Sequence, residues 1–307
     1  MNTRDASCIG LVSAGLLLAA TSLTAAPTVD GLLDPAYGPA LAVQTTQTGF
    51  GDNLSELNAA YAIVENGTLY LMLTGNLQNN GNRLEIFIDA VAGGQNVLQN
   101  NVDFSGNNPT NDGWAGKFAG FTFDAGFEAD RLLIARRENN ELLLDYAVIA
   151  GDASSYQNVF GGSDVGSGAT GTGANASPIQ IAYNDSNVAG VTGGTGAANQ
   201  AAALAVTTGL ELAIALADLG DPADGILISA FINGSNHDFL SNQLLGPIEP
   251  QGNLGGDGNA GFTGTLAAID LNDFAGNQYF TVIVPEPATF TLLGLGGLLM
   301  VRRRAAR

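Results

Sequence analysis

The sequence predicts an all-β protein whose body is a single β-sandwich with a Gly-rich loop insertion, flanked by a signal peptide and one C-terminal hydrophobic helix. Apolar residues alternate with polar ones at a period of two in many short runs, and segments containing Gly and Asn separate these runs. Short strands of this kind, divided by turns, are typical of two packed sheets. Nine runs are interpreted as strands, at residues 58–64, 68–74, 83–89, 131–136, 142–149, 179–183, 210–216, 226–232 and 278–283.

The first 25 residues have the features of a secretory signal peptide. Arg4 precedes an uncharged, largely apolar stretch over residues 9–20, and small residues follow it. We expect export through the Sec machinery and cleavage by signal peptidase after Ala25, because cleavage after Ala26 would put a proline directly at the cut. Cys8 is the only cysteine, so the mature body is predicted to contain no disulfide and no thiolate site.

The net charge of the chain indicates which classes of molecule are expected to bind to it. The chain has 29 acidic and 10 basic residues, for a net charge of −19, and a cluster of the basic residues lies in the C-terminal tail. Such an acidic body repels nucleic acid and anionic lipid headgroups, which are therefore not expected as partners. It suits neutral polysaccharide, or bridging by Ca²⁺. The alternative is that the acidity only keeps an exported protein soluble.

The body, residues 26–283, has a predicted hairpin near its start. Asn66-Gly67 lies between the runs 58–64 and 68–74, and Asn-Gly is the favoured pair for a two-residue turn. In the run 83–89 we expect one face to point inward and the other outward. The two alternating sets are Leu84, Ile86 and Ile88, and Glu85, Phe87 and Asp89.

Residues 151–199 are rich in glycine and are predicted to be a loop insertion, apart from the strand at 179–183. Gly166, Gly168 and Gly171 have the spacing of a dinucleotide-binding loop, but no β-α-β pattern surrounds them, which argues against that class of site. Two segments are helix-like. Residues 197–206 form a helical patch, and residues 266–274 are expected to hold a turn of helix.

Trp114 is the only tryptophan, and its loop-like context predicts exposure. We favour ordinary packing for this side chain, and the alternative is a platform for the apolar face of a sugar ring. Oxygen atoms nearby are weak candidates for Ca²⁺ ligands, although they lack the spacing of an EF-hand loop. These belong to Asp103, Asn107, Asn111 and Asp112. No other cofactor is predicted.

The sequence contains no recognisable catalytic motif, and we predict that the protein is not an enzyme. His237 is the only histidine, and neither a nucleophile-elbow nor a zinc-protease pattern accompanies it. We expect a loop histidine that is hydrogen-bonded to Asp238. Carboxylate pairs for glycoside hydrolysis are available among the many acidic residues, but their abundance makes them uninformative.

Residues 284–307 consist of a short motif, an apolar run and a basic end. Val284, Pro285, Glu286 and Pro287 form the motif, which is predicted to be extended and exposed because proline disfavours helix at its own position and the one before. The apolar run 288–301 would reach about 21 Å as a helix. Three arginines follow the apolar run and are called the basic stop. They are expected to lie at the cytoplasmic headgroups, with the body on the far side of the membrane. The basic stop comprises Arg302, Arg303 and Arg304.

This C-terminal arrangement resembles the PEP-CTERM sorting signal. Proteins of that family are exported by Gram-negative bacteria that make extracellular polysaccharide, and an exosortase in the inner membrane is thought to process the tail. The resemblance implies a protein that is anchored transiently in the inner membrane and then resides at the cell surface or outside the cell. Exosortase is the partner that it implies.

Three places in the body are similar to family 9 carbohydrate-binding modules and their DOMON-like relatives, which are β-sandwiches. They are residues 29–34, residues 68–71 leading to 84–89, and residues 210–220. Two functional hypotheses follow from the resemblances. In the first, the protein is a non-catalytic surface or matrix component that associates with exopolysaccharide. In the second, it is an exported glycan-active enzyme that uses carboxylates on the β-sandwich.

Overall fold

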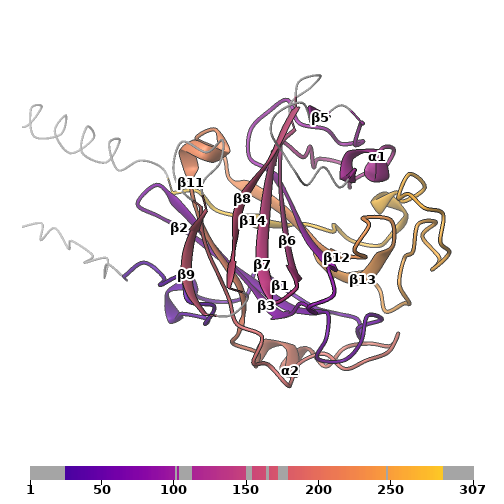
Figure 1. Ribbon diagram of the computed structural model, residues 1–307, viewed down its shortest axis with the longest axis horizontal. Coiled ribbons are helices and arrows are strands. Elements are labelled where there is room, and N and C mark those ends of the chain that lie inside the picture. Colours follow the sequence, from indigo (N-terminus) through magenta and orange to yellow (C-terminus); the bar gives the residue numbers. More distant parts are fainter. Residues whose placement is uncertain are drawn as a thin grey trace, which may run out of the picture.

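The computed structural model describes residues 25–100, 102–103, 113–149, 154–163, 166–171, 179–246 and 248–285. It consists of two sheets with very few helical turns, and the strands pair antiparallel except for one short parallel pair in the larger sheet (Figure 1). The six-stranded sheet has the order β1 (Ala42–Val43), β2 (Glu56–Glu65), β3 (Thr68–Asn76), β11 (Gly209–Ala215), β10 (Ile179–Tyr183), β9 (Gly166–Gly171). The eight-stranded sheet has the order β13 (Leu240–Leu245), β12 (Ile226–Asn233), β4 (Arg83–Asp89), β6 (Arg131–Glu138), β7 (Glu141–Val148), β8 (Ser154–Ser163), β5 (Val102–Asp103), and β14 (Phe280–Val282) pairs with β12.

The nine predicted runs all coincide with strands, and the all-β sandwich is confirmed for the body. The predicted hairpin is β2–β3, in which Glu65 pairs with Thr68. Asn66 and Gly67 between them have φ angles of 51° and 77°. Two positive φ angles in succession are what a type I′ turn needs, and Asn and Gly adopt them at the lowest cost.

The main hydrophobic core lies between the two sheets. Alternate residues of β3 and β11 meet alternate residues of β4, β6, β7 and β12 there. Because side chains alternate across a strand, the apolar period of two places one set from each strand on this inner face. The set from β3 is Leu69, Leu71 and Leu73, and the set from β4 is Leu84, Ile86 and Ile88, all almost completely buried.

The second face of β4 is also buried, which corrects the expectation that it points outward. Phe87 and Glu85 are both 0% exposed. A third layer covers this face of the eight-stranded sheet. It consists of irregular segments before β6 and after β13, on the side away from β2 and β11 (Figure 1). Backbone bridges hold the layer together, among them Val97 with Thr122 and Thr122 with Asp270.

Five strands and one helix were not predicted. β8 and β9 lie in the Gly-rich region, so the expectation of a loop is wrong for 154–163 and 166–171, whereas it is confirmed for 184–199, which contain no strand. Glycine weakens strand propensity without preventing pairing, and β8 pairs with β7 over eight residues. β1, β5 and β13 were missed because the first two are two residues long and the third, Leu-Ser-Asn-Gln-Leu-Leu, lacks clear alternation. The missed helix is α1 (Trp114–Phe118).

The predicted helical patches are confirmed as short elements. α2 (Gln200–Leu204) begins after Asn199, whose side chain accepts hydrogen bonds from the backbone N–H groups of Ala201 and Ala202. A 3₁₀ turn, η3 (Leu271–Asp273), lies in the second patch. Two further 3₁₀ turns are η1 (Pro35–Tyr37) and η2 (Leu216–Leu219). Within the described ranges, none of the helices has the length and apolar character needed to cross a membrane.

Candidate functional site

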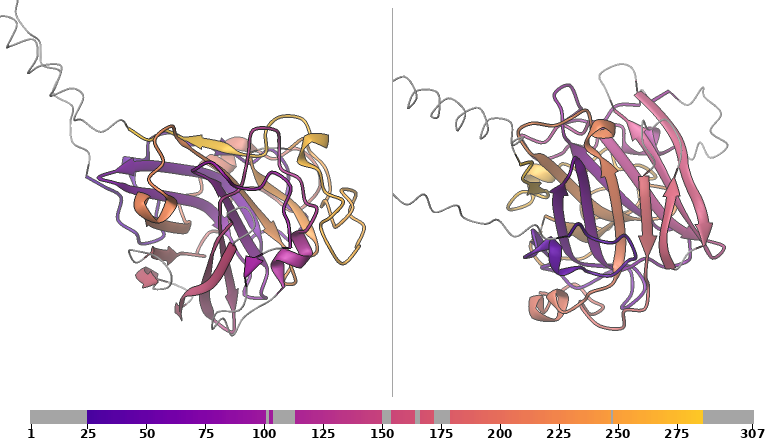
Figure 2. Two further views of the ribbon diagram at one scale, coloured as in Figure 1. Left: turned by 90° about the horizontal axis from the view of Figure 1, so that it is seen from above. Right: turned by 90° about the vertical axis from the view of Figure 1, so that its left-hand side faces the viewer.

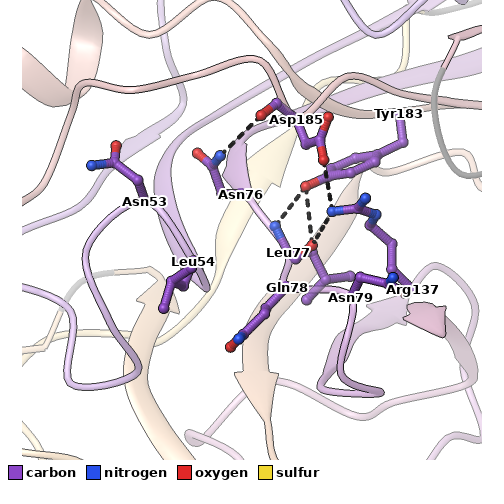
Figure 3. Close-up of a pocket in the computed structure, with 9 residues that line it drawn as sticks. All are labelled: Asn53, Leu54, Asn76, Leu77, Gln78, Asn79, Arg137, Tyr183 and Asp185. Atoms are coloured by element: carbon purple, nitrogen blue, oxygen red, sulfur yellow. Dashed lines mark hydrogen bonds and ion pairs between the residues drawn. The ribbon is translucent and has the colours of Figure 1, made fainter. Parts of the chain in front are cut away.

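A small hollow opens at the end of the sandwich where β3 and β6 finish (Figure 3). Its volume is about 200 Å³. Four separate parts of the chain contribute to it: the loop before β2, the loop after β3, the end of β6, and the end of β10 with the residues that follow. The lining is mainly polar and comprises Asn53, Leu54, Asn76, Leu77, Gln78, Asn79, Arg137, Tyr183 and Asp185.

One wall of the hollow is an ion pair stacked on an aromatic ring. The Nη1 atom of Arg137 lies 2.7 Å from Oδ2 of Asp185 and donates to the carbonyl oxygen of Leu77 at 2.9 Å. The guanidinium group lies over the ring of Tyr183, 5.2 Å from its centroid. The hydroxyl of Tyr183 accepts a hydrogen bond from the N–H of Leu77 at 2.6 Å. Burial raises the pKa of Tyr183, so this hydroxyl stays protonated.

The hollow is supported from behind by a buried carboxylate and its amide partners. Glu56, fully buried on β2, accepts from the side chain of Asn58 at 3.1 Å and from that of Asn187 at 3.0 Å. It also accepts from the backbone N–H of Asn53 at 2.9 Å. Burial raises the pKa of Glu56, against these hydrogen bonds, which lower it. Asn187 in turn donates to Oδ1 of Asn76, so the network reaches the lining itself.

Two acceptor atoms of the lining have no hydrogen-bond partner among the described residues, one of them buried and one partly exposed. Oδ1 of Asn53 is buried and has no hydrogen-bond partner among the described residues. The side chain of Asp185 is 31% exposed, and only its Oδ2 is engaged by Arg137. Leu54 is 45% exposed and adds an apolar surface. In Figure 3, Asn53 and Leu54 lie on one side of the hollow, and Asn76, Asp185 and Arg137 lie on the other. The site therefore offers donors, acceptors and an apolar patch together.

This hollow was not predicted from the sequence. Its residues are separated by up to about 130 positions, and no local motif links them. The only available signal was the density of side-chain amides between residues 76 and 82, where four asparagines and one glutamine occur. A stretch of this composition is equally typical of a turn, because Asn is favoured in turns for conformational reasons alone.

Trp114 is a core residue, which corrects the expectation that it is exposed. It opens α1, is 1% exposed, and belongs to the aromatic cluster under the third layer. Its ring meets that of Phe118 edge-on, with 6.4 Å between centroids, and Phe118 meets Phe87 of β4 at 5.4 Å. The loop-like context was misleading because the whole segment folds back onto the sheet. Trp114 therefore presents no platform to a glycan.

The Ca²⁺ candidates receive no support from the described residues. The backbone of Asp103 is part of β5, but its side chain lies outside the described part of the structure. Asn107, Asn111 and Asp112 also lie outside it. Among the described residues, no group of three or more His, Cys, Asp or Glu side chains is placed to hold a metal ion.

His237 contacts Glu85 rather than Asp238, which corrects a second expectation. Its Nδ1 atom lies 2.5 Å from Oε1 of Glu85, and both side chains are fully buried. Asp238 instead forms an ion pair with Lys117 at 3.1 Å. A fully buried pair has no access to substrate, so its geometry fits a structural role.

The predicted sorting motif begins at the edge of the described structure. Val284 is half-buried and packs against the main core, and Pro285 after it is exposed. Glu286, Pro287 and the basic stop lie outside the described residues. At the other end, Ala25 is the first described residue and is exposed, and Ala26 is half-buried.

Comparison with known proteins does not assign a family. The chain matches no protein-family model, no curated protein and no solved structure. The resemblances to the PEP-CTERM signal and to carbohydrate-binding modules thus remain hypotheses that rest on the residues that carry them.

Proposed function

We propose that this protein is an exported cell-surface or extracellular-matrix protein of a Gram-negative bacterium, sorted through a C-terminal PEP-CTERM signal and associated with exopolysaccharide without catalysis. The observation that carries the proposal is the position of the motif relative to the folded body. β14 ends at Val282, Ile283 is 81% exposed, and Pro285 is exposed. The motif thus begins two residues after the last strand, with Val284 half-buried against the core and Pro285 exposed, which supports a processing site at the edge of the folded body.

The positions of the two described ends also favour this proposal. The two ends of the described chain lie on the same side of the molecule (Figures 1 and 2). A signal peptide and a tail anchor must both reach the same membrane during export. A body whose two described ends lie on one side allows both ends to face that membrane once the body has folded.

A binding role is favoured over glycan hydrolysis by the chemistry of the hollow. Hydrolysis of a glycosidic bond commonly uses two carboxyl groups that face each other across the bond. Among the nine lining residues, Asp185 is the only carboxylate, and it is paired with Arg137. The lining groups are suited to holding a ligand by hydrogen bonds. An exported glycan-active enzyme is the alternative function.

Processing of the tail tests the proposal directly. The full chain and the variant Pro285→Ala/Pro287→Ala are produced in a host that contains an exosortase, and intact mass and membrane fractionation are measured. We expect the wild type to lose its tail and the variant to be secreted and folded but to keep it. A wild-type protein that retains Arg307 at its mature end would overturn the sorting proposal.

A second experiment separates binding from catalysis. The purified full chain is applied to a glycan array, and release of reducing sugar from the same glycans is followed in parallel. The proposed function predicts retention on one or more polysaccharides without release. Release of reducing sugar would instead support the alternative enzyme.

A further inference from the structure

We propose that the hollow between the end of β3 and the end of β6 binds one neutral sugar unit of a glycan. This inference rests on the proposed association with exopolysaccharide and assigns it to particular residues. Three properties of the hollow suit such a ligand. Its lining side chains carry no net charge, they include both hydrogen-bond donors and hydrogen-bond acceptors, and they form a small apolar patch.

The charge of the site argues for a neutral ligand. Arg137 and Asp185 are the only ionic side chains in the lining, and they are paired at 2.7 Å. Nη1 of Arg137 also donates to the carbonyl oxygen of Leu77, so the cation is already occupied by protein acceptors. The chain as a whole carries a net charge of −19. An anionic sugar would meet an unfavourable field and would have to compete with Asp185 for its counterion.

The open polar groups argue for hydroxyls. Oδ1 of Asn53 has no partner among the described residues, and because the atom is buried, a ligand hydroxyl reaches it only when the Asn53 side chain turns toward the hollow; an unpaired buried acceptor costs about 1–3 kcal/mol, which favours such a turn. Oδ1 of Asp185 is a second acceptor at the partly exposed rim. Gln78 lines the hollow and accepts from Asn80 with its Oε1 atom, while its amide N–H groups form no hydrogen bond with the described residues. A hydroxyl both donates and accepts, so a sugar satisfies this mixture, whereas a carboxylate or phosphate does not.

Size and shape limit the ligand to a single unit. The volume of about 200 Å³ lies below the roughly 300–1,000 Å³ typical of pockets for drug-sized ligands, so the hollow suits one sugar ring rather than a longer segment. Leu54 is 45% exposed at the rim and offers an apolar surface to the C–H face of the ring. It takes the place of an aromatic platform, because the face of Tyr183 is covered by Arg137.

The site is held in place before any ligand arrives. Asn76 donates to the backbone carbonyl oxygens of Asp185 at 3.3 Å and of Asn187 at 3.1 Å. Asn79 and Asn140 exchange hydrogen bonds of 2.8 Å and 3.1 Å across neighbouring loops. Groups fixed in this way lose little conformational entropy when a ligand binds, which favours measurable affinity from a few contacts.

Two single variants test the site. Gln78→Ala removes a donor amide from a half-buried side chain. Asn53→Gly removes the unpaired acceptor, and glycine readily adopts the φ of 54° found at this position. Asn259→Ala, an exposed amide in a loop outside the hollow, is the matched control. Each full chain is purified in mild detergent, and thermal melting verifies that it is folded.

Binding is measured by titration calorimetry with dextran, galactomannan and xylan as neutral probes and alginate as an anionic probe. We expect the wild type to bind at least one neutral probe and not alginate, and each hollow variant to bind about three- to tenfold more weakly, the change produced by one neutral hydrogen bond. Asn259→Ala should bind like the wild type. A free neutral monosaccharide of the bound glycan should compete.

Three results would overturn the assignment: no binding to any neutral probe, preference for alginate, or unchanged affinity in both hollow variants. The last of these, with wild-type binding intact, would leave the association with polysaccharide standing and move its site elsewhere. Normal processing of the tail together with no binding would leave the sorting proposal standing and remove the glycan role. The two proposals therefore fail in distinguishable ways.

Discussion

The Nδ1 atom of His237 lies 2.5 Å from Oε1 of Glu85, between the eight-stranded sheet and the layer that covers it. Glu85 belongs to β4, and His237 belongs to a loop that turns with a left-handed φ of 57°. Asn233 at the end of β12 donates to the same carboxylate oxygen at 3.4 Å. These contacts attach the loop after β12 to β4, and they do so where no water reaches either group.

Removal of the imidazole is therefore expected to destabilise the protein. His237→Ala leaves Glu85 buried without its closest partner, and the loss of one member of a buried pair typically costs about 3–5 kcal/mol in free energy of unfolding. Urea unfolding of the full chain measures the change. Lys117→Ala, which breaks the partly exposed pair with Asp238, is the control and should cost about 1 kcal/mol or less. Equal stability of His237→Ala and wild type would contradict the structural role.

Trp114→Ala is expected to destabilise the protein by about 3–5 kcal/mol, because it empties a large volume in the aromatic cluster. Phe262→Ala is the matched control, since Phe262 is 69% exposed, and its unfolding free energy should stay within about 0.5 kcal/mol of the wild type. Denaturant unfolding measures both. Glycan binding by the folded Trp114→Ala protein should be unchanged. Weaker binding without loss of stability would restore the sugar-platform interpretation.

Asp130 gives the protein a predictable pH dependence. Burial raises the pKa of Asp130 from 3.8 to about 6, although hydrogen bonds from the N–H groups of Val91 and Ala90 lower it. A raised folded pKa means that the folded state binds the proton more tightly than the unfolded state. The carboxyl of Asp130 therefore stabilises the folded state below about pH 4, and this stabilisation is lost as the pH rises through about 6.

The test compares urea unfolding of the wild type and Asp130→Asn at several pH values between 4 and 7. As the pH rises across this window, the free energy of unfolding of the wild type should fall by at most about 3 kcal/mol relative to that of Asp130→Asn. Asp257→Asn should show the opposite sign, and only below about pH 4, because hydrogen bonds from the N–H groups of Asn259 and Gly261 hold the pKa of Asp257 below its usual value of 3.8, so its measurements are extended to more acidic pH. A pH-independent difference for Asp130→Asn would show that the carboxyl titrates normally.

The basic stop is predicted to control retention rather than processing. Deletion of Arg302 to Arg304 removes the charges that are expected to remain at cytoplasmic headgroups, so the unprocessed form should shift from the membrane fraction to the soluble fraction. Replacement of the three arginines by lysine keeps the charge and should preserve retention. Fractionation in a host without exosortase isolates this step. Undiminished membrane retention of the deleted form would show that the apolar run suffices.

The sequence by itself determined the class of fold, because the relevant information is local. Period-two alternation in runs such as 68–74 and 226–232 depends only on the geometry of a strand. Asn66-Gly67 specifies its turn through the φ angles that these two residues tolerate. The alternation also identified Leu84, Ile86 and Ile88 as one face of β4, and this face does line the main core.

Only the tertiary structure decided what covers the second face of β4 and which residues far apart in the sequence come into contact. Local periodicity predicts that Glu85 and Phe87 share a side of β4, but it carries no information on whether solvent or a third layer lies there. For the same reason it misplaced Trp114 and the partner of His237. The hollow needs β3, β6 and β10 to end at the same place, and that is a consequence of strand register and sheet pairing. Contacts between residues far apart in sequence depend on the packing of the whole chain, so no single segment specifies them.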